Sequence, residues 1–305
     1  MAPHARRPYA KLRAAGALAV LLAACAPMPT PVAVPQPRVP SGQSAALAAH
    51  YTSVQQSLLA QGLLRTDGGD MDFPLTPAML SRNFLRIAFY EEYSPSGAQI
   101  ATPIRLTRWA QPVRVKLHFG ADMPADRTAA DRARIGSYLA RLSQLTGLPI
   151  SLVQSDPNFT IAITNADDRR SLGPLVQTAL PQITPRQVAS VTNLDRNTYC
   201  LVWTQSNAQT HVYERAFVYI PSEHPDLMRL ACIHEEIAQA LGLPNDVGTA
   251  RPSIFNDDEE FALLTRQDEA MLRMLYNPAL KLGMTEAEAR PIVERLAADI
   301  LGGNT

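Results

Sequence analysis

Three side chains between positions 235 and 245 have the chemistry and the spacing to hold a cation. Glu235 and Gln239 are four residues apart, so on a helix their oxygens lie on the same side. Asn245 follows shortly after and could supply a third oxygen. Three oxygen ligands with one formal charge suit a hard cation such as calcium, or no metal at all. They suit zinc poorly, because zinc prefers imidazole and thiolate ligands.

Glu236 is the candidate general base beside these ligands. It follows Glu235 directly, and one step along a helix turns the side chain by about 100°. That offset lets a carboxylate act on a metal-bound water. Without the metal, water keeps a pKa far above neutral and Glu236 has little to activate. Three alternatives therefore stay open, namely a hydrogen-bonded network without catalysis, an active hydrolase, and a structural or regulatory cation site.

His234 adjoins this group, and its spacing predicts a place in the core. It belongs to an apolar stripe whose members are separated by alternating steps of three and four residues. We therefore expect a hydrogen-bonded core histidine. The alternative is a weak catalytic role, in which His234 approaches the cleft and pairs with Glu236 or a substrate carbonyl. The stripe consists of Leu227, Leu230, His234, Ile237 and Leu241.

The segment also resembles a known catalytic helix. A direct His-Glu-x-x-His motif starting at His234 fails because position 238 is alanine. Shifted by one residue, 235–243 is similar to the His-Glu-x-x-His-Ala-Leu-Gly-Leu helix of metzincin peptidases. This overlay implies Glu235, Gln239 and Asn245 at the three metal-ligand positions and Glu236 at the position of the catalytic glutamate. Residues 253–256, Ser-Ile-Phe-Asn, resemble the metzincin Ser-Ile-Met turn, with Phe255 replacing the methionine.

A second resemblance covers residues 80–285. This region resembles domain of unknown function 2927, a family of bacterial lipoproteins, through the motif His-Glu-Glu-x-x-Gln-Ala-Leu-Gly-Leu at 234–243. The two resemblances imply an α+β, zincin-like fold. Its parts are a mixed twisted sheet, an upper helix, an active-site-type helix and a C-terminal helical part. Whether the chain is an enzyme stays open; if it is, the resemblance implies a metallopeptidase-like hydrolase.

Hydrophobic periodicity and end signals predict the elements that must position these residues. The segment 171–198 is expected to hold only loops and short helices. Strand 215–220 is expected to be the edge of the sheet. Helices are expected over 43–64, over 129–145 with Gly147 as the stop, from Pro225 as first residue to just before Gly242, and after Thr265 with Asp268 in its capping box. Strands are expected over 84–93, 113–119, 150–154, 159–164, 199–204 and 215–220.

The first 24 residues have the pattern of a secretion signal. A basic start precedes an apolar run over 14–24, which is too short to span a bilayer. The run ends in Leu-Ala-Ala-Cys, which matches the lipobox of bacterial lipoproteins and predicts that Cys25 carries acyl chains such as palmitate. The alternative is a plain signal peptide with a chance cysteine. Ala26, rather than aspartate, favours the outer membrane, with the domain facing the periplasm.

The remaining chain divides by composition. Residues 25–42 are expected to be an acylated, proline-rich tether, because six prolines and a single charge occur between 26 and 40. A helical lead-in over 43–80, the zincin-like domain over 81–284 and a C-terminal helix over 285–305 follow.

The number of Lys plus Arg residues and the number of Asp plus Glu residues are both 28, and removing residues 1–24 leaves 24 basic residues. A net charge of −4 gives no support to a nucleic-acid partner.

Three cysteines occur in the chain. If Cys25 is acylated, Cys200 and Cys232 remain as an even pair in an oxidising compartment. This predicts a disulfide, with two buried thiols as the alternative.

We therefore expect a lipid-anchored periplasmic module that binds a peptide or protein without catalysis, through β-augmentation at strand 215–220. The alternative is a metal-dependent peptidase or amide hydrolase with Glu236 as its base.

Overall fold

The computed structural model describes residues 39–69, 72, 74–93, 99–256 and 258–302. All of them lie in a compact unit that begins at residue 37. The expected signal, Cys25 and the tether up to residue 38 lie outside the described residues, so those predictions stay predictions. Within the described ranges, no helix is both long and apolar enough to cross a membrane.

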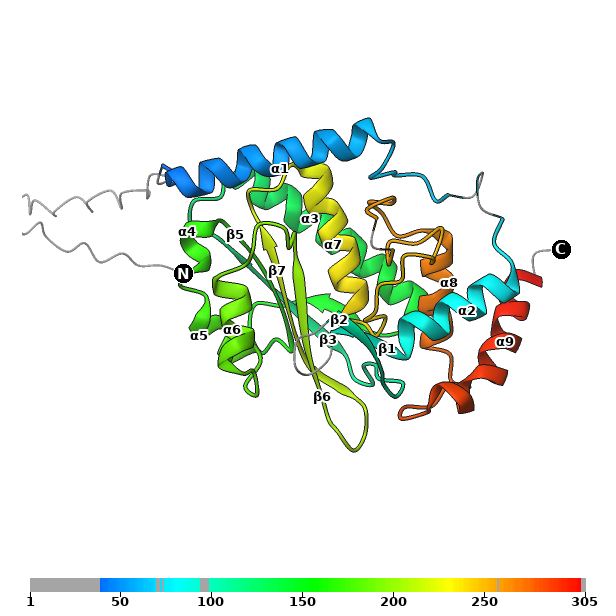
Figure 1. Ribbon diagram of the computed structural model, residues 1–305. Coiled ribbons are helices and arrows are strands. Elements are labelled where there is room, and N and C mark those ends of the chain that lie inside the picture. The colour runs from blue at the N-terminus through cyan, green and yellow to red at the C-terminus, as the bar shows by residue number, and fades with distance from the viewer. Residues whose placement is uncertain (1–38, 70–71, 73, 94–98, 257, 303–305) are drawn as a thin grey trace, which may run out of the picture. The chain divides into compact units, whose positions relative to one another are not determined.

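The described chain contains nine helices and seven strands (Figure 1). The helices are α1 (Gly42–Ala60), α2 (Pro77–Ala88), α3 (Ala125–Thr146), α4 (Ala166–Arg169), α5 (Gly173–Ala179), α6 (Pro185–Thr192), α7 (Asp226–Gln239), α8 (Arg266–Leu275) and α9 (Glu286–Gly302). The strands are β1 (Tyr90–Tyr93), β2 (Gln99–Pro103), β3 (Val113–Phe119), β4 (Ile150–Leu152), β5 (Phe159–Thr164), β6 (Leu201–Ser206) and β7 (Tyr213–Pro221). The arrangement confirms a mixed α/β fold with a C-terminal helical part.

A five-stranded mixed sheet forms the centre, in the order β4-β3-β5-β7-β6. The first four strands run parallel, and β6 pairs antiparallel with β7. The prediction that strand 215–220 lies at the edge is wrong, because β7 bonds to β5 on one side and to β6 on the other. The apolar run over 216–220 fits this central place, since a strand buried on both faces has no polar alternation. The edge strand next to β7 is β6.

The two faces of the sheet contribute to different cores. On β7, Ala216 and Val218 belong to the main core with residues of α3, α7 and α8. Phe217 and Tyr219 point the other way and pack with Val176 of α5 and other residues of the α5–α6 region. Helices thus cover both faces, and Figure 1 shows α3 and α7 apart from α5 and α6.

The first half of the segment predicted as strand 84–93 is helix. Helix α2 covers Pro77–Ala88, and only Tyr90–Tyr93 is a strand. The alternation from residue 84 onward misled the prediction, because the buried residues Leu80, Phe84 and Ile87 follow helical spacing instead. Thr76 caps the helix through a bond from the Met79 N–H, and Pro77 occupies its first turn.

Local end signals were correct for two other helices. Helix α3 ends at Gly147, whose φ of 69° is in the left-handed region that favours glycine. Helix α8 begins with the predicted capping box, in which Thr265 and Asp268 bond to each other's backbone N–H groups.

Helix α1 confirms the predicted helix over 43–64, and it supplies a cap to α7. The residue before α7 is Pro225, which has no side-chain acceptor, so the first N–H groups of the helix need another partner. Gln55 of α1 provides one by accepting from the Met228 N–H at 3.0 Å. Tyr51 of α1 is fully buried, with its ring centroid 4.3 Å from that of His224. The N-terminal lead-in is therefore part of the support of α7.

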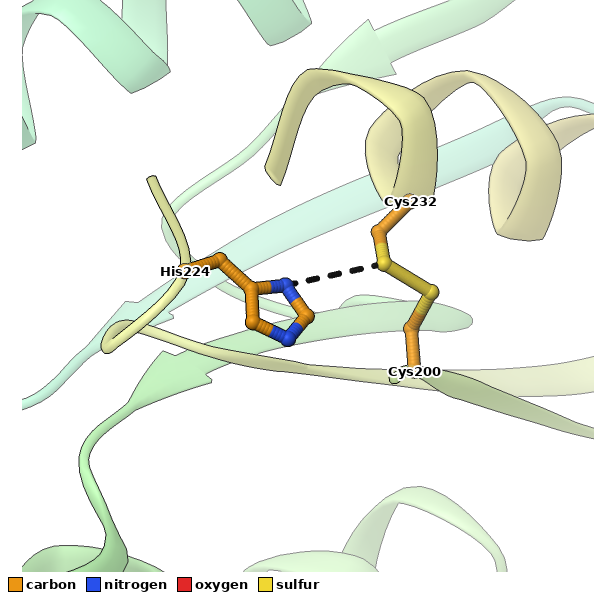
Figure 2. The surroundings of a disulfide bond; sticks show 3 residues. All are labelled: Cys200, His224 and Cys232. Atoms are coloured by element: carbon orange, nitrogen blue, oxygen red, sulfur yellow. Dashed lines mark hydrogen bonds between the residues drawn. A yellow bond between two sulfur atoms is a disulfide. The ribbon is translucent and has the colours of Figure 1, made fainter. Parts of the chain in front are cut away.

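A disulfide joins Cys200, just before β6, to Cys232 of α7, which confirms the predicted pair. Figure 2 shows His224 beside this bond, with its Nδ1 atom 3.8 Å from the Cys232 Sγ atom. His224 is buried, and burial lowers its pKa to about 3, so its imidazole is neutral at pH 7. The covalent link fixes the start of the edge strand to the helix that carries the candidate site.

We predict that replacing both cysteines, as Cys200→Ala/Cys232→Ala, lowers the free energy of unfolding by about 3–4 kcal/mol. The residues lie 32 positions apart, and a loop of that size gains this much chain entropy in the unfolded state when the bond is lost. Urea unfolding at pH 7, with and without reductant, measures the difference. The double variant is expected to be insensitive to reductant. Reaction of both wild-type thiols with a thiol reagent in unreduced, denatured protein would contradict the bond itself.

Candidate functional site

Helix α7 carries the predicted site, and it is buried along most of its length. Its apolar residues Ile233 and Ile237 are part of the main core, as is Leu241 just beyond its end. Trp109 also fixes that end, because its indole N–H donates to the Ala240 carbonyl at 2.8 Å. Polar side chains on such a helix must find partners inside the protein, since an unsatisfied buried polar group costs about 1–3 kcal/mol.

The amides of Gln239 and Asn245 are bonded to different partners. The Gln239 Nε2 atom donates to the Asp246 carboxylate, at 3.1 and 3.2 Å from its two oxygens. The Asn245 Nδ2 atom donates to the Arg86 carbonyl at 2.9 Å, in the last turn of α2. The first bond ties the segment after α7 back to the helix, and the second caps a carbonyl at the end of α2. Both side chains act here as structural hydrogen-bond donors.

These residues do not fit a zinc site. The set of Glu235, Gln239 and Asn245 contains no imidazole and no thiolate, and zinc prefers both. A calcium ion requires six to eight oxygens, of which these residues offer few. Across the ranges that the structure describes, no group of three or more His, Cys, Asp and Glu side chains could hold a metal ion. No metal-assisted step is therefore derived for this chain, and the cation site stays a prediction.

Glu236 is placed on α7 as predicted, but its side chain is buried. Only 5 % of the residue is exposed, compared with 8 % for Gln239 and 3 % for Asn245. Glu235 is partly exposed. A general base must come within hydrogen-bonding distance of the proton that it removes. In this conformation the candidate base is closed to a substrate arriving from solvent.

His234 occupies the core position that its spacing predicts. Its ring stacks on Tyr138 of α3 at 4.0 Å between centroids, and its Nδ1 atom accepts from the Leu264 N–H at 3.1 Å. An acceptor nitrogen carries no proton, so the neutral ring holds its proton on Nε2. Burial, with a smaller effect of the Arg141 charge, lowers the pKa of His234 to about 4. These contacts are those of a satisfied core histidine.

The turn at 253–256 is held by a fully buried carboxylate on α8. Asp268 accepts from the Ser253 hydroxyl at 2.6 Å, from the Ile254 N–H at 3.1 Å and from both the N–H and hydroxyl of Thr265 at 2.8 Å. Burial raises the pKa of Asp268 to about 6, although these hydrogen bonds act to lower it. The sequence predicted the capping bond to Thr265 but missed the bonds to the turn, because nothing local relates residues 253 and 268. Phe255 is fully buried in the main core.

The sequence predicted strand β6 as a strand over 199–204 but did not place it at the edge of the sheet. Its composition contained a signal, because Thr204, Gln205 and Ser206 end the strand with polar residues, whereas β7 ends in a continuous apolar run. Among the hollows of the described fold, one lies near the start of α9 and another beside β6. Neither is lined by Glu235, Glu236, Gln239 or Asn245.

We predict that His234→Asn reduces the acid sensitivity of the fold. In the wild type, the unfolded state takes up a proton below pH 6.5 whereas folded His234 stays neutral down to about pH 4. The free energy of unfolding therefore falls as pH falls through this window, and from pH 7 to 4.5 this group accounts for about 2–3 kcal/mol. Asparagine can keep an acceptor for Leu264 without this titration.

Urea unfolding of both proteins at pH 7 and pH 4.5 measures this effect. The variant is expected to be less stable at pH 7, because it loses the stacking on Tyr138, but to lose less stability on acidification. Some loss remains, because the buried His224 has the same sign of dependence. An equal loss in both proteins would show that His234 does not resist protonation in the fold.

Comparison with known proteins places the chain in a family. No curated protein gives a significant match. A family model described as "Protein of unknown function (DUF2927)" matches residues 77–295, which is more than half of the chain. The match begins at α2 and includes the five-stranded sheet, α7 and α8, but not α1. The chain therefore belongs to the DUF2927 family.

Proposed function

We propose that this protein is a lipid-anchored periplasmic module that binds an extended segment of a peptide or protein along strand β6, without catalysis. The observation that carries the proposal is the position of β6. It is six residues long, it ends the sheet, and among the described strands it pairs only with β7. An edge strand presents N–H and C=O groups that another chain can bond by β-augmentation.

The support of β6 suits such a role. Its pairing with β7 and the disulfide at Cys200 hold it in place, and its residues are half-buried rather than covered. A rigid strand loses little conformational entropy when a ligand binds, and this favours affinity. Val202 packs toward the main core, whereas Leu201 and Trp203 pack toward the α5–α6 region. A bound segment would therefore present alternate side chains to two different surroundings.

The absence of catalysis in the proposal rests on the residues of α7. Gln239 and Asn245 use their amides to hold the segment after the helix, and Glu236 is nearly enclosed. A helix of this kind serves as a support for the edge strand beside it.

A selection experiment tests the peptide-binding proposal. We predict that the full-length chain, solubilised in detergent, enriches binders from a phage-displayed library of random dodecapeptides. Thr204→Pro and Gln205→Pro are matched variants, because adjacent N–H groups of a strand point alternately inward to β7 and outward. The variant that removes the outward N–H is expected to stay folded, as measured by circular dichroism. It is expected to bind the selected peptides at least about tenfold more weakly, which corresponds to a loss of roughly 1.4 kcal/mol of binding free energy.

The inward variant is the control for stability, since it loses a bond to β7 and is expected to unfold at lower urea. If the wild type enriches no peptides, the edge-binding proposal is wrong. If both folded variants bind the selected peptides as the wild type does, binding occurs elsewhere on the molecule.

A hydrolase is the second candidate, favoured by the presence of Glu235, Glu236 and Gln239 on one helix beside the edge strand. We predict that purified protein contains less than stoichiometric metal by elemental analysis and that Glu236→Gln binds the selected peptides unchanged. A stoichiometric metal that chelator removes and that Glu235→Ala lacks would instead favour the hydrolase. Cleavage of a selected peptide by the wild type but not by Glu236→Gln would do the same.

The lipid anchor has its own test. We predict that the full-length protein sediments with membranes and that Cys25→Ser moves it to the soluble periplasmic fraction, because the variant has no acyl acceptor. Cys25 alone is changed, so the Cys200–Cys232 bond serves as an internal control for export and oxidation. Equal sedimentation of both proteins would contradict anchoring through Cys25.

A further inference from the structure

A small hollow of about 130 Å³ lies beside the edge strand, on its α5–α6 side. A single water needs roughly 10–15 Å³ of such space, so the hollow has room for a group of several atoms. One wall is the second half of β6, and the other is the segment from the end of α5 into α6. The lining residues are Trp203, Thr204, Gln205 and Ser206 from the strand and Leu180, Gln182, Ile183 and Gln187 from the opposite wall.

One lining residue of the hollow, Trp203, carries an unused hydrogen-bond donor. The Trp203 indole N–H is closed to solvent and has no partner among the described residues. The other tryptophan of the chain, Trp109, donates its indole N–H to Ala240. Buried indole N–H groups normally have an acceptor, so the state of Trp203 is unusual. A ligand could contact this nitrogen only after a neighbouring side chain moves, and Gln182 of the lining is exposed.

The acceptors of the neighbouring glutamines are already engaged. The Gln187 Oε1 atom accepts from the Thr184 N–H at 3.0 Å and from its hydroxyl at 2.9 Å. The Gln205 carbonyl, in the orientation that its neighbours require, accepts from the N–H groups of Gln182 and Ile183, both at 3.0 Å. Neither carbonyl serves as an acceptor for the Trp203 indole N–H, which stays without a partner among the described residues. A group that enters must bring an acceptor of its own.

The lining carries no charged side chain. A carboxylate would lose its bound water here without gaining a cation as a partner. The free energy of removing a charged group from water is larger than that of removing a neutral polar group. A carboxamide brings the carbonyl acceptor without a charge. Its NH₂ group can remain at the mouth of the hollow, in contact with water.

We propose that this hollow is a specificity pocket for an asparagine or glutamine side chain of the segment that pairs with β6. The inference rests on the proposed edge binding and adds the kind of residue that the site selects. The Trp203 indole N–H donates to the carboxamide oxygen of the bound residue. Aspartate and glutamate are discriminated against because they are charged.

Titration followed by ¹⁵N–¹H NMR of the indole groups tests the pocket directly, because the chain has only two tryptophans. The probes are N-acetylglutamine methylamide and, as the matched charged control, N-acetylglutamate methylamide at pH 7, both added to the full-length protein. The Trp203 signal, identified by its loss in Trp203→Phe, is expected to move downfield and saturate with the glutamine probe. The glutamate probe is expected to bind at least about tenfold more weakly. The Trp109 signal serves as the internal control.

No movement of the Trp203 signal, or equal movement with both probes, would overturn the pocket. The peptides selected on the full-length chain separate this failure from that of edge binding. Selected peptides with asparagine or glutamine enriched at one position, and with that preference lost in Trp203→Phe, support the pocket. Selected peptides without that preference overturn the pocket and leave edge binding intact, and an empty selection overturns both.

Discussion

The burial of helix α7 is the constraint on which the rest of this structure depends. The helix packs its apolar side into the main core, and ten of its residues are buried, among them Arg229, His234, Glu236 and Gln239. Each buried polar group on it must be satisfied from within the protein, because water does not reach it. Other segments supply the partners: Gln55 from α1 at its first turn, Leu264 at His234, and Asp246 at Gln239. The Arg229 guanidinium is likewise bonded to the fully buried Asp131 of α3 at 2.9 Å.

This constraint decides what the candidate site can do. A catalytic glutamate and metal ligands need access to substrate and a shared centre, whereas Gln239 and Asn245 donate to partners in different directions. The same side chains join the segment that follows α7 to the helix itself and to the last turn of α2. We therefore assign the proposed peptide binding to the edge of the sheet, which α7 supports. The disulfide at Cys232 contributes by joining the helix to the start of β6.

Much of the fold could be predicted from local patterns. Strand β5 matches its expected bounds, 159–164, and Gly147 and Thr265 mark helix ends where they were expected. The disulfide followed from counting cysteines. The failures are of two kinds, which are a misread local periodicity at α2 and pairing between strands that are distant in the sequence. Helix α2 was taken for a strand because, over a short window, the apolar residues fit both the strand period of two and the helix period of 3.6. The cap at Thr76, which marks the start of a helix, was overlooked. The central place of β7 depends on its pairing with β5, 57 residues earlier in the chain, as for Phe159 beside Ala216.

The sequence by itself determined most of the helices and strands, which cysteines pair, and that His234 faces the core. These properties follow from spacing and from the chemistry of neighbouring residues, both of which are written along the chain. Only the tertiary structure decided which strand is at the edge, which partner each polar group of α7 bonds, and that Asp268 holds the turn at Ser253. Those outcomes depend on which segments meet when the core excludes water. Hydrogen bonds between distant residues form where burial brings a donor next to an acceptor, and a local sequence pattern does not predict which two residues meet.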